Sequence, residues 1–198
     1  MSTRSVRFFG LVLITALALT TAASCMDDGS NFNEYDNFVA ATKRADQEGW
    51  KPYWLGRSFT AGGLTFNGPG VGEFGDEIEG GGIRYNYDAK IGKGGVGLDV
   101  LIYSPSAWAY AKEIGRTRGS LGATTRDADV AGHDAMLSVS KDAKGFVDQV
   151  RADITIDGVI VSAQAGRVTG VGVDGDLNPL TDEATFLAVL DHLRLYPE

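Results

Sequence analysis

The chain has 198 residues, 43% of them hydrophobic, and carries a formal net charge of −8. A single domain of this length can bury a substantial apolar core. The acidic excess argues against binding to nucleic acid, because a phosphate backbone attracts clustered lysine and arginine side chains. Cys25 is the only cysteine in the sequence, so no disulfide can form within one chain.

The first 24 residues have the layout of a signal peptide. Arg4 and Arg7 precede an uncharged, mostly apolar run over residues 8–19, and small residues follow at 20–24. This order is typical of exported proteins whose leader is removed. The apolar run is shorter than the ~20 residues that a membrane-spanning helix needs. We therefore expect a cleaved leader over residues 1–24 and no permanent membrane span.

Cys25 follows these small residues directly. Residues 22–25, Ala-Ala-Ser-Cys, resemble the lipobox of bacterial lipoproteins, whose cysteine is lipidated and becomes the first mature residue. This resemblance covers residues 1–25 and implies an exported, extracytoplasmic protein attached to the bacterial membrane by acyl chains on Cys25. The alternative is ordinary secretory cleavage, which would leave a free thiol. Residues 53–56, Tyr-Trp-Leu-Gly, resemble a segment of uncharacterised bacterial exported lipoproteins, and this resemblance implies no activity.

Residues 25–32 are expected to form a short tether, and residues 33–198 to form one domain. Asn33 can cap a helix that runs to about Glu48, because apolar residues recur there at helical spacing and Gly49 follows as a stop signal. One face of this helix should pack on a sheet.

Alternating apolar and polar residues predict several strands. Residues 83–87 and 98–102 are expected to form the two strands of one hairpin. Residues 53–59 and 64–66 are shorter strand-like pieces, and residues 135–139 fit one further strand. The sheet should therefore begin before the middle of the chain and continue after it.

A second helix is predicted after the first hairpin. Ser104 can serve as its N-cap, with Pro105 at the first helical position and Gly115 as its end. Three residues are expected to share the face that points inward: Trp108, Ala111 and Ile114. Two stretches are predicted as loops, the glycine-rich acidic residues 68–82 and the polar residues 116–129.

The strongest indication of the fold comes from residues 150–165. Asp157-Gly158 favours a two-residue turn of type I′. This turn would place four apolar pairs opposite one another: Ile156 with Val159, Ile154 with Val161, Ala152 with Ala163, and Val150 with Ala165. A shift of one residue would bury charged side chains, so the sequence should fix the register of this hairpin.

The last predicted element is a helix from Thr181, its expected cap, through Leu195, with Phe186, Leu190 and Leu193 facing inward. Helices alternate with hairpins rather than with single strands. This order predicts an α+β class: a single domain with a mostly antiparallel sheet and about three helices packed on it.

Asp174, Asp176 and Asn178 have the alternate spacing with which calcium loops supply oxygen ligands. Pro179 occupies the position that needs glycine, and Thr185 replaces the bidentate glutamate at the twelfth position. These three residues are thus a candidate calcium site, with a polar turn before the last helix as the alternative. No other cofactor is expected. Residues 70–75 spell a dinucleotide fingerprint, but more glycines and acids follow instead of the helix that this motif requires.

No common catalytic motif is present. The sequence has no Gly-x-Ser-x-Gly and no His-Glu-x-x-His, and its histidines are His133 and His192. Seven aromatic residues could form a stacking platform, although aromatic residues more often lie in the core: Trp50, Tyr53, Trp54, Tyr85, Tyr87, Trp108 and Tyr110. The leading hypothesis is a non-catalytic envelope lipoprotein that binds a protein partner or a small ligand. The alternative is an exported, hydrolase-like enzyme with a site around His133 or His192.

Overall fold

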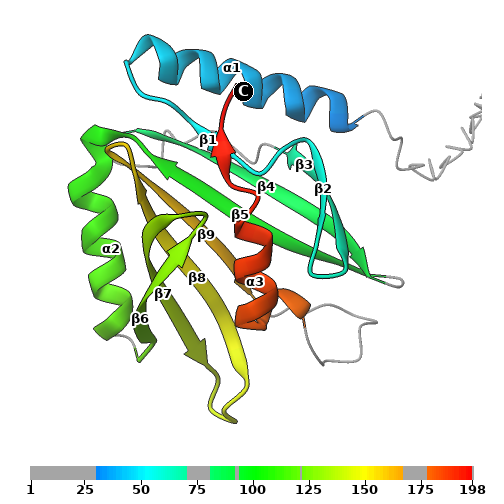
Figure 1. Ribbon diagram of the computed structural model, residues 1–198, viewed down its shortest axis with the longest axis vertical. Coiled ribbons are helices and arrows are strands. Elements are labelled where there is room, and N and C mark those ends of the chain that lie inside the picture. Colours follow the sequence, from blue (N-terminus) through cyan, green and yellow to red (C-terminus); the bar gives the residue numbers. More distant parts are fainter. Residues whose placement is uncertain (1–29, 71–80, 92–93, 121, 167–177, 198) are drawn as a thin grey trace, which may run out of the picture.

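A computed structural model describes residues 30–70, 81–91, 94–120, 122–166 and 178–197. The side chains at 30–34 and 115–120 are not described. The helices, shown in Figure 1, are α1 (Ser30–Gln47), α2 (Trp108–Ser120) and α3 (Glu183–Leu190), with 3-10 turns η1 (Pro105–Ala107) and η2 (Pro179–Thr181). The strands are β1 (Tyr53–Trp54), β2 (Ser58–Ala61), β3 (Leu64–Gly70), β4 (Gly82–Ile91), β5 (Gly94–Tyr103), β6 (Thr124–Val130), β7 (His133–Lys141), β8 (Val147–Ile156), β9 (Val159–Gly166) and β10 (Arg194–Leu195).

Eight strands form one antiparallel sheet in the order β2-β3-β4-β5-β9-β8-β7-β6. Two four-stranded meanders, β2 to β5 and β6 to β9, therefore meet where β5 pairs with β9. The short strands β1 and β10 pair separately, with Tyr53 opposite Leu195. The predicted α+β class, with a mostly antiparallel sheet and three helices on it, is confirmed for the described part of the chain.

The two predicted hairpins are present. In β8 and β9 all four predicted apolar pairs are opposite one another, including Ile154 with Val161. Asp157 and Gly158 have φ values of 45° and 82°, as a type I′ turn requires. In β4 and β5, Ile83 lies opposite Ile102. Turn chemistry and alternation therefore set the register of β8 and β9, and alternation favours that of β4 and β5.

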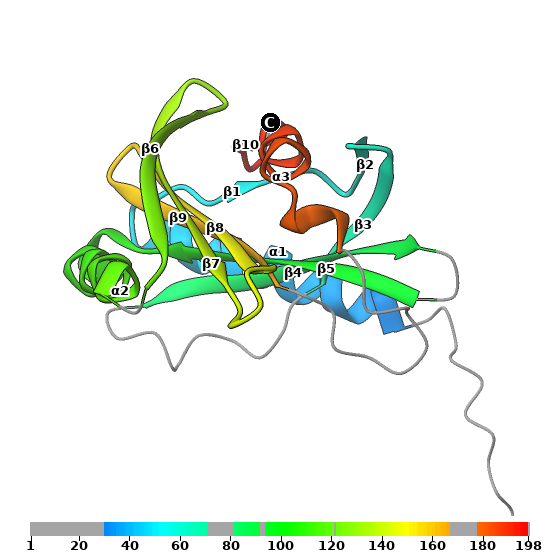
Figure 2. The same ribbon diagram turned by 90° about the horizontal axis from the view of Figure 1, so that it is seen from below.

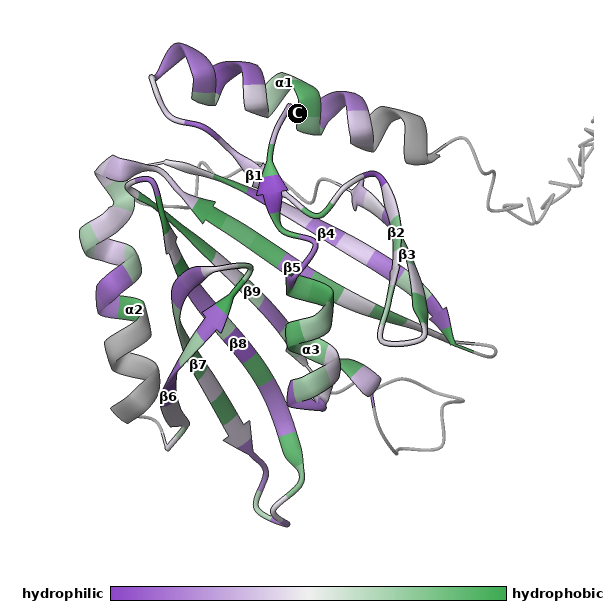
Figure 3. Cartoon of the chain, viewed as in Figure 1, coloured by the Kyte–Doolittle hydropathy of each residue, from purple (hydrophilic) through white to green (hydrophobic). Residues whose placement is uncertain are grey.

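The face of the sheet that packs on α1 and α3, here called the inner face, carries the main core. Phe38 of α1 packs edge-on against Tyr85 of β4, with ring centroids 5.1 Å apart. Phe186 and Leu190 of α3 are buried in the same core. Seen from below, β6 and the β2–β3 hairpin rise on either side of α3 (Figure 2). Figure 3 shows the alternation of hydrophobic and hydrophilic residues along β8 that places one set on this face.

Helix α2 packs on the opposite face, here called the outer face. Ala107 and Ala111 form a small apolar cluster with Tyr103 of β5 and Ile160 of β9. The prediction that Trp108 points inward is wrong, because that side chain remains 39% exposed. The small alanine side chains let the helix approach the sheet closely, and the larger indole lies beside this contact.

Two predicted segments, the loop over residues 116–129 and the tether over residues 25–32, have the wrong bounds. Residues 116–129 are not a loop, because α2 continues to Ser120 and β6 occupies Thr124–Val130. As the edge strand of the sheet, β6 can be largely polar and still form its ladder with β7. At the N-terminal side, α1 begins at Ser30 and shortens the predicted tether of residues 25–32.

The C-terminal helix also differs from the prediction. Its N-cap is Asp182 rather than Thr181, and the Asp182 carboxylate accepts a hydrogen bond from the Thr185 backbone N–H at 2.9 Å. This bond, joined by one from the Thr185 hydroxyl, lowers the pKa of Asp182. The helix ends at Leu190 rather than Leu195, since Arg194 and Leu195 pair with β1 instead.

Candidate ligand-binding cleft

A cleft of about 870 Å³ lies between α2 and the outer face of the second meander. Small-molecule sites in proteins commonly have volumes of ~300–1,000 Å³. Helix α2 contributes Trp108, Ala111 and Lys112, and strands β6 to β9 contribute Asp127, Asp134, Met136, Asp153, Thr155 and Ile160. The cleft thus combines apolar side chains with several carboxylates.

The α2 wall of the cleft presents an aromatic ring and a cation. The Lys112 ammonium lies 3.5 Å from the centre of the Trp108 ring. A cation over the face of an indole is attracted by the negative face of the ring. Because Trp108 stays partly exposed, this ring face is accessible to a bound molecule that displaces the lysine.

Cross-strand pairing brings the carboxylates of the cleft together. Asp127 of β6 lies opposite Met136 of β7, which lies opposite Asp153 of β8. Directly opposite residues project from the same face of a sheet, so this row lines the cleft. Among the described residues, the carboxylates of Asp127 and Asp134 have no ion pair. The described lining of the cleft therefore carries more carboxylates than cations.

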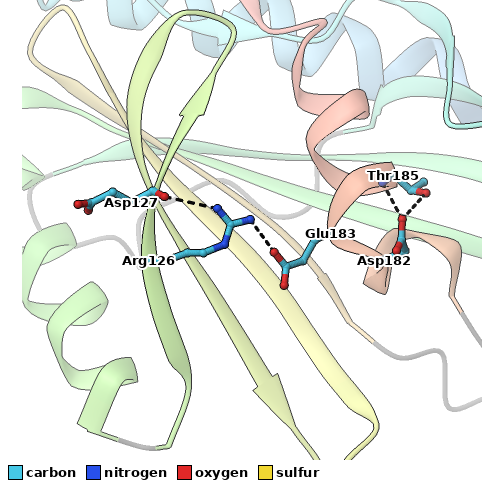
Figure 4. Close-up of polar contacts among 5 residues, drawn as sticks. All are labelled: Arg126, Asp127, Asp182, Glu183 and Thr185. Carbon is cyan, nitrogen blue, oxygen red and sulfur yellow. Dashed lines mark hydrogen bonds and ion pairs between the residues drawn. The ribbon is translucent and has the colours of Figure 1, made fainter.

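The side chains of neighbouring residues of β6 project from opposite faces of the sheet. Figure 4 shows Arg126 reaching Glu183 at the start of α3 while Asp127 points away, towards the side on which α2 lies. The Arg126 Nη2 to Glu183 Oε2 distance is 2.6 Å. This ion pair ties the edge strand to α3, and so helps to hold the strand that carries Asp127.

The floor beside the cleft contains a buried ion pair. Arg151 is 2% exposed, and its Nε donates to both carboxylate oxygens of Asp153 at 2.8 and 3.0 Å. Its Nη2 lies 2.6 Å from Asp153 Oδ1, although without the angle of a further hydrogen bond. Ser138 and Ser162 are buried nearby in the strand ladder, and their hydroxyls have no hydrogen-bond partner among the described residues. Arg151 therefore neutralises the Asp153 carboxylate, whereas Asp127 and Asp134 have no ion pair among the described residues.

The candidate calcium residues are only partly described, because Asp174 and Asp176 lie outside the described residues. Asn178 is buried, and its Nδ2 donates to the Gly166 carbonyl at 2.6 Å while its Oδ1 accepts from the Leu180 N–H at 3.0 Å. Its side chain thus caps η2. Within the described ranges, no group of histidine, cysteine and acidic side chains is arranged to hold a metal. The calcium site stays a prediction.

The two histidines occupy different elements. His133 begins β7 opposite Val130, and the His192 ring lies 4.9 Å from the ring of Phe59. In the described part of the chain, neither imidazole has a hydrogen bond or ion pair to a carboxylate. Most of the candidate stacking aromatics are buried in the core, namely Trp50, Tyr53, Tyr85 and Tyr87, whereas Trp108 and Tyr110 are exposed.

Two sequence predictions near the N-terminus and one motif lie outside the described residues: the leader over residues 1–24, the lipidated Cys25 and the fingerprint beyond Gly70. None of the described helices is long and apolar enough to cross a bilayer. Comparisons of the chain with protein-family models, curated proteins and solved structures give no match.

Proposed function

We propose that the protein is an exported, non-catalytic lipoprotein, anchored to the bacterial membrane at Cys25, that binds a small organic ligand in the cleft between α2 and strands β6 to β9. The observation that carries the binding proposal is the exposed Trp108 ring at the wall of a cleft of about 870 Å³. An accessible aromatic ring in a concave, largely apolar site is typical of small-molecule binding.

The charges in the cleft favour a ligand with an amino group. Met136, Ile160 and Trp108 offer contacts to an apolar body, and the carboxylates of Asp127 and Asp134 would attract a positive charge. A ligand ammonium could also replace that of Lys112 over the indole. The expected ligand class is therefore a small organic amine with an apolar or aromatic body.

A thermal-shift screen tests this assignment. Amines such as phenethylamine should raise the unfolding midpoint, whereas phenylacetate should cause no rise that depends on Trp108. A ligand at ~100 times its dissociation constant stabilises the native state by about 2.7 kcal/mol, or roughly 5–10 °C for a domain of this size. Trp108→Ala should abolish the rise.

The control for that variant is Phe146→Ala, which removes an aromatic ring that is 54% exposed outside the cleft. It should keep the full response to the amine. An equal midpoint rise in Trp108→Ala would place the binding elsewhere. A screen without any response would remove the small-amine proposal and leave a protein partner, to be sought by cross-linking in intact cells.

The anchor is tested separately. When the chain with its leader is produced in bacteria, the protein should sediment with membranes and be released by detergent, because several acyl chains make a stable attachment. Cys25→Ser should move it almost entirely to the soluble fraction. The Trp108→Ala protein should stay with the membranes, because attachment at Cys25 does not depend on binding in the cleft. Firm attachment of the Cys25→Ser protein would refute lipidation at this residue.

The alternative function remains an exported hydrolase-like enzyme that uses His133 or His192. The contacts of the described residues give neither histidine an acidic partner to orient it, as a general base commonly has. We therefore favour the binding protein.

A further inference from the structure

The free edge of strand β6 is a second surface that can bind a partner. Among the described residues, β6 pairs with β7 on one side only and ends the eight-stranded sheet. Five of its seven residues are exposed. The edge strand at the other end of the sheet, β2, offers only four residues. The longer stretch of open edge is therefore that of β6.

The register of the β6–β7 hairpin shows which backbone groups of β6 point away from the sheet. Its two-residue turn places Val130 opposite His133, and the residues that flank such a turn exchange backbone hydrogen bonds. Hydrogen-bonded and non-hydrogen-bonded pairs then alternate along an antiparallel ladder. The N–H and C=O groups of Thr125, Asp127 and Asp129 therefore point outward, away from β7.

These outward backbone groups make one other contact in the described part of the chain. The Asp127 carbonyl accepts a bond of 3.4 Å from Arg126 Nη1 (Figure 4). A carbonyl oxygen has two lone pairs, so it can accept a second bond. The Arg126 guanidinium is itself held by Glu183 at the start of α3. The remaining outward groups are available to an added strand.

The side chains beside these backbone groups are negatively charged. Asp127 and Asp129 project from the outer face, as does Asp134, which lies directly opposite Asp129 on β7. The Asp129 carboxylate accepts a bond from the Gly132 N–H at 3.1 Å, which positions it without neutralising it. None of the three carboxylates has an ion pair with another described residue. Like charges directly opposite repel, so a cation placed beside Asp129 would be stabilised.

We propose that the edge of β6 binds an extended peptide segment of a partner protein, with lysine at two alternate positions of the segment. In an added strand, backbone hydrogen bonds supply affinity and alternate side chains supply specificity. Residues opposite Asp127 and Asp129 would project from the outer face, where lysine ammonium groups can reach both carboxylates. The residue between them would lie opposite Ala128, which packs against the core, and should be apolar. An acidic strand would be repelled.

The probe is a blocked peptide, acetyl-Thr-Lys-Val-Lys-Val-Thr-Val-amide, which in antiparallel pairing sets its lysines opposite Asp129 and Asp127. Binding to the full-length chain is followed by hydrogen exchange of backbone amides in ¹H–¹⁵N NMR spectra. The peptide should protect the amides of Thr125, Asp127 and Asp129 in a saturable manner. The amides of Arg126 and Ala128 should change much less, because they already bond to β7.

Two methylated forms of the probe separate strand pairing from simple attraction between charges. Methyl groups on the backbone nitrogens of both lysines remove N–H groups that face β6, and should weaken binding at least about tenfold. Methyl groups on the backbone nitrogens of the first two valines, which face away from β6, should weaken it by about threefold at most. A peptide with glutamate in place of both lysines should not bind.

Substitutions in the protein test the charges. Asp129→Asn should weaken binding of the probe about threefold, because one exposed ion pair contributes little, and its amide oxygen can still accept the Gly132 bond. Asp148→Asn makes the same change of charge at an exposed residue of β8 and should leave binding unchanged. Trp108→Ala should also leave it unchanged, so that failure of peptide docking and failure of amine binding in the cleft can be told apart.

Four results would overturn the proposal. The probe could leave the three amides unprotected at millimolar concentration, the peptide with methylated lysines could bind as well as that with methylated valines, or the glutamate peptide could bind equally well. Asp129→Asn could also bind the probe as tightly as Asp148→Asn does. Protection of the same amides by a higher protein concentration alone would assign the edge to a second copy of this chain, and would equally overturn it.

Discussion

Asp153→Ala is expected to destabilise the folded protein by about 3–5 kcal/mol, because it leaves the Arg151 guanidinium buried without its counter-charge. The two side chains are only 2% and 11% exposed, so water cannot replace the lost carboxylate fully. Urea unfolding with and without the substitution measures the effect. Adding Arg151→Met to Asp153→Ala should recover much of the loss, since it removes the uncompensated charge and keeps a side chain of similar length.

The matched control is an exposed ion pair of the same length that also contains an arginine. Arg126 and Glu183 are also 2.6 Å apart, but their side chains are 51% and 43% exposed. Arg126→Ala should therefore cost no more than about 1 kcal/mol. If the exposed and the buried substitutions cost the same, burial of Arg151 does not determine the energetics of its ion pair with Asp153.

Phe38→Ala should destabilise the protein by about 3–5 kcal/mol, the usual range for deleting a buried aromatic side chain. Phe38 joins four elements, because its ring packs on Trp54 of β1, Tyr85 of β4 and Tyr196 after β10, with centroid distances of 6.0, 5.1 and 5.1 Å. Its loss would leave a cavity that these rigid rings cannot close. The measurement is the midpoint and slope of denaturant unfolding.

Phe146→Ala is the control for Phe38→Ala, because it removes the same ring from an exposed turn between β7 and β8. Its expected cost is within about 0.5 kcal/mol, as for most surface substitutions. A loss below 1 kcal/mol for Phe38→Ala would mean that α1 contributes little to the stability of the sheet.

The sequence predicts hairpins well where the turn chemistry is explicit. Asp157-Gly158 supplies two residues that adopt positive φ readily, and the register of β8 and β9 follows from it. The β6–β7 hairpin turns at Ala131-Gly132 with Ala131 at φ 52°. Alanine seldom adopts this conformation, so Ala131-Gly132 is a weaker turn signal than Asp157-Gly158, and the polar strand before it resembles a loop.

The candidate cleft can be predicted from the sequence only in part. The pattern of α2 predicts an inward Trp108 because large apolar residues usually define the buried face of a helix. Instead, the small residues Ala107 of η1 and Ala111 of α2 define that face, since they allow close packing on Tyr103. The meeting of Asp127 with Asp153 depends on the pairing of β6 with β7 and of β7 with β8, which cannot be deduced while β6 is taken for a loop.

The two outer strands of the large sheet have a consequence for self-association. An edge strand offers unpaired N–H and C=O groups to which a strand of another molecule can add. In this sheet β2 has only four residues, and β6 carries the charged residues Arg126, Asp127 and Asp129. Addition of a second copy at β6 in a register that sets Asp127 of one copy opposite Asp129 of the other would place like charges together. We therefore expect neighbouring copies of this protein to remain separate at high density, without joining their sheets into a continuous ribbon.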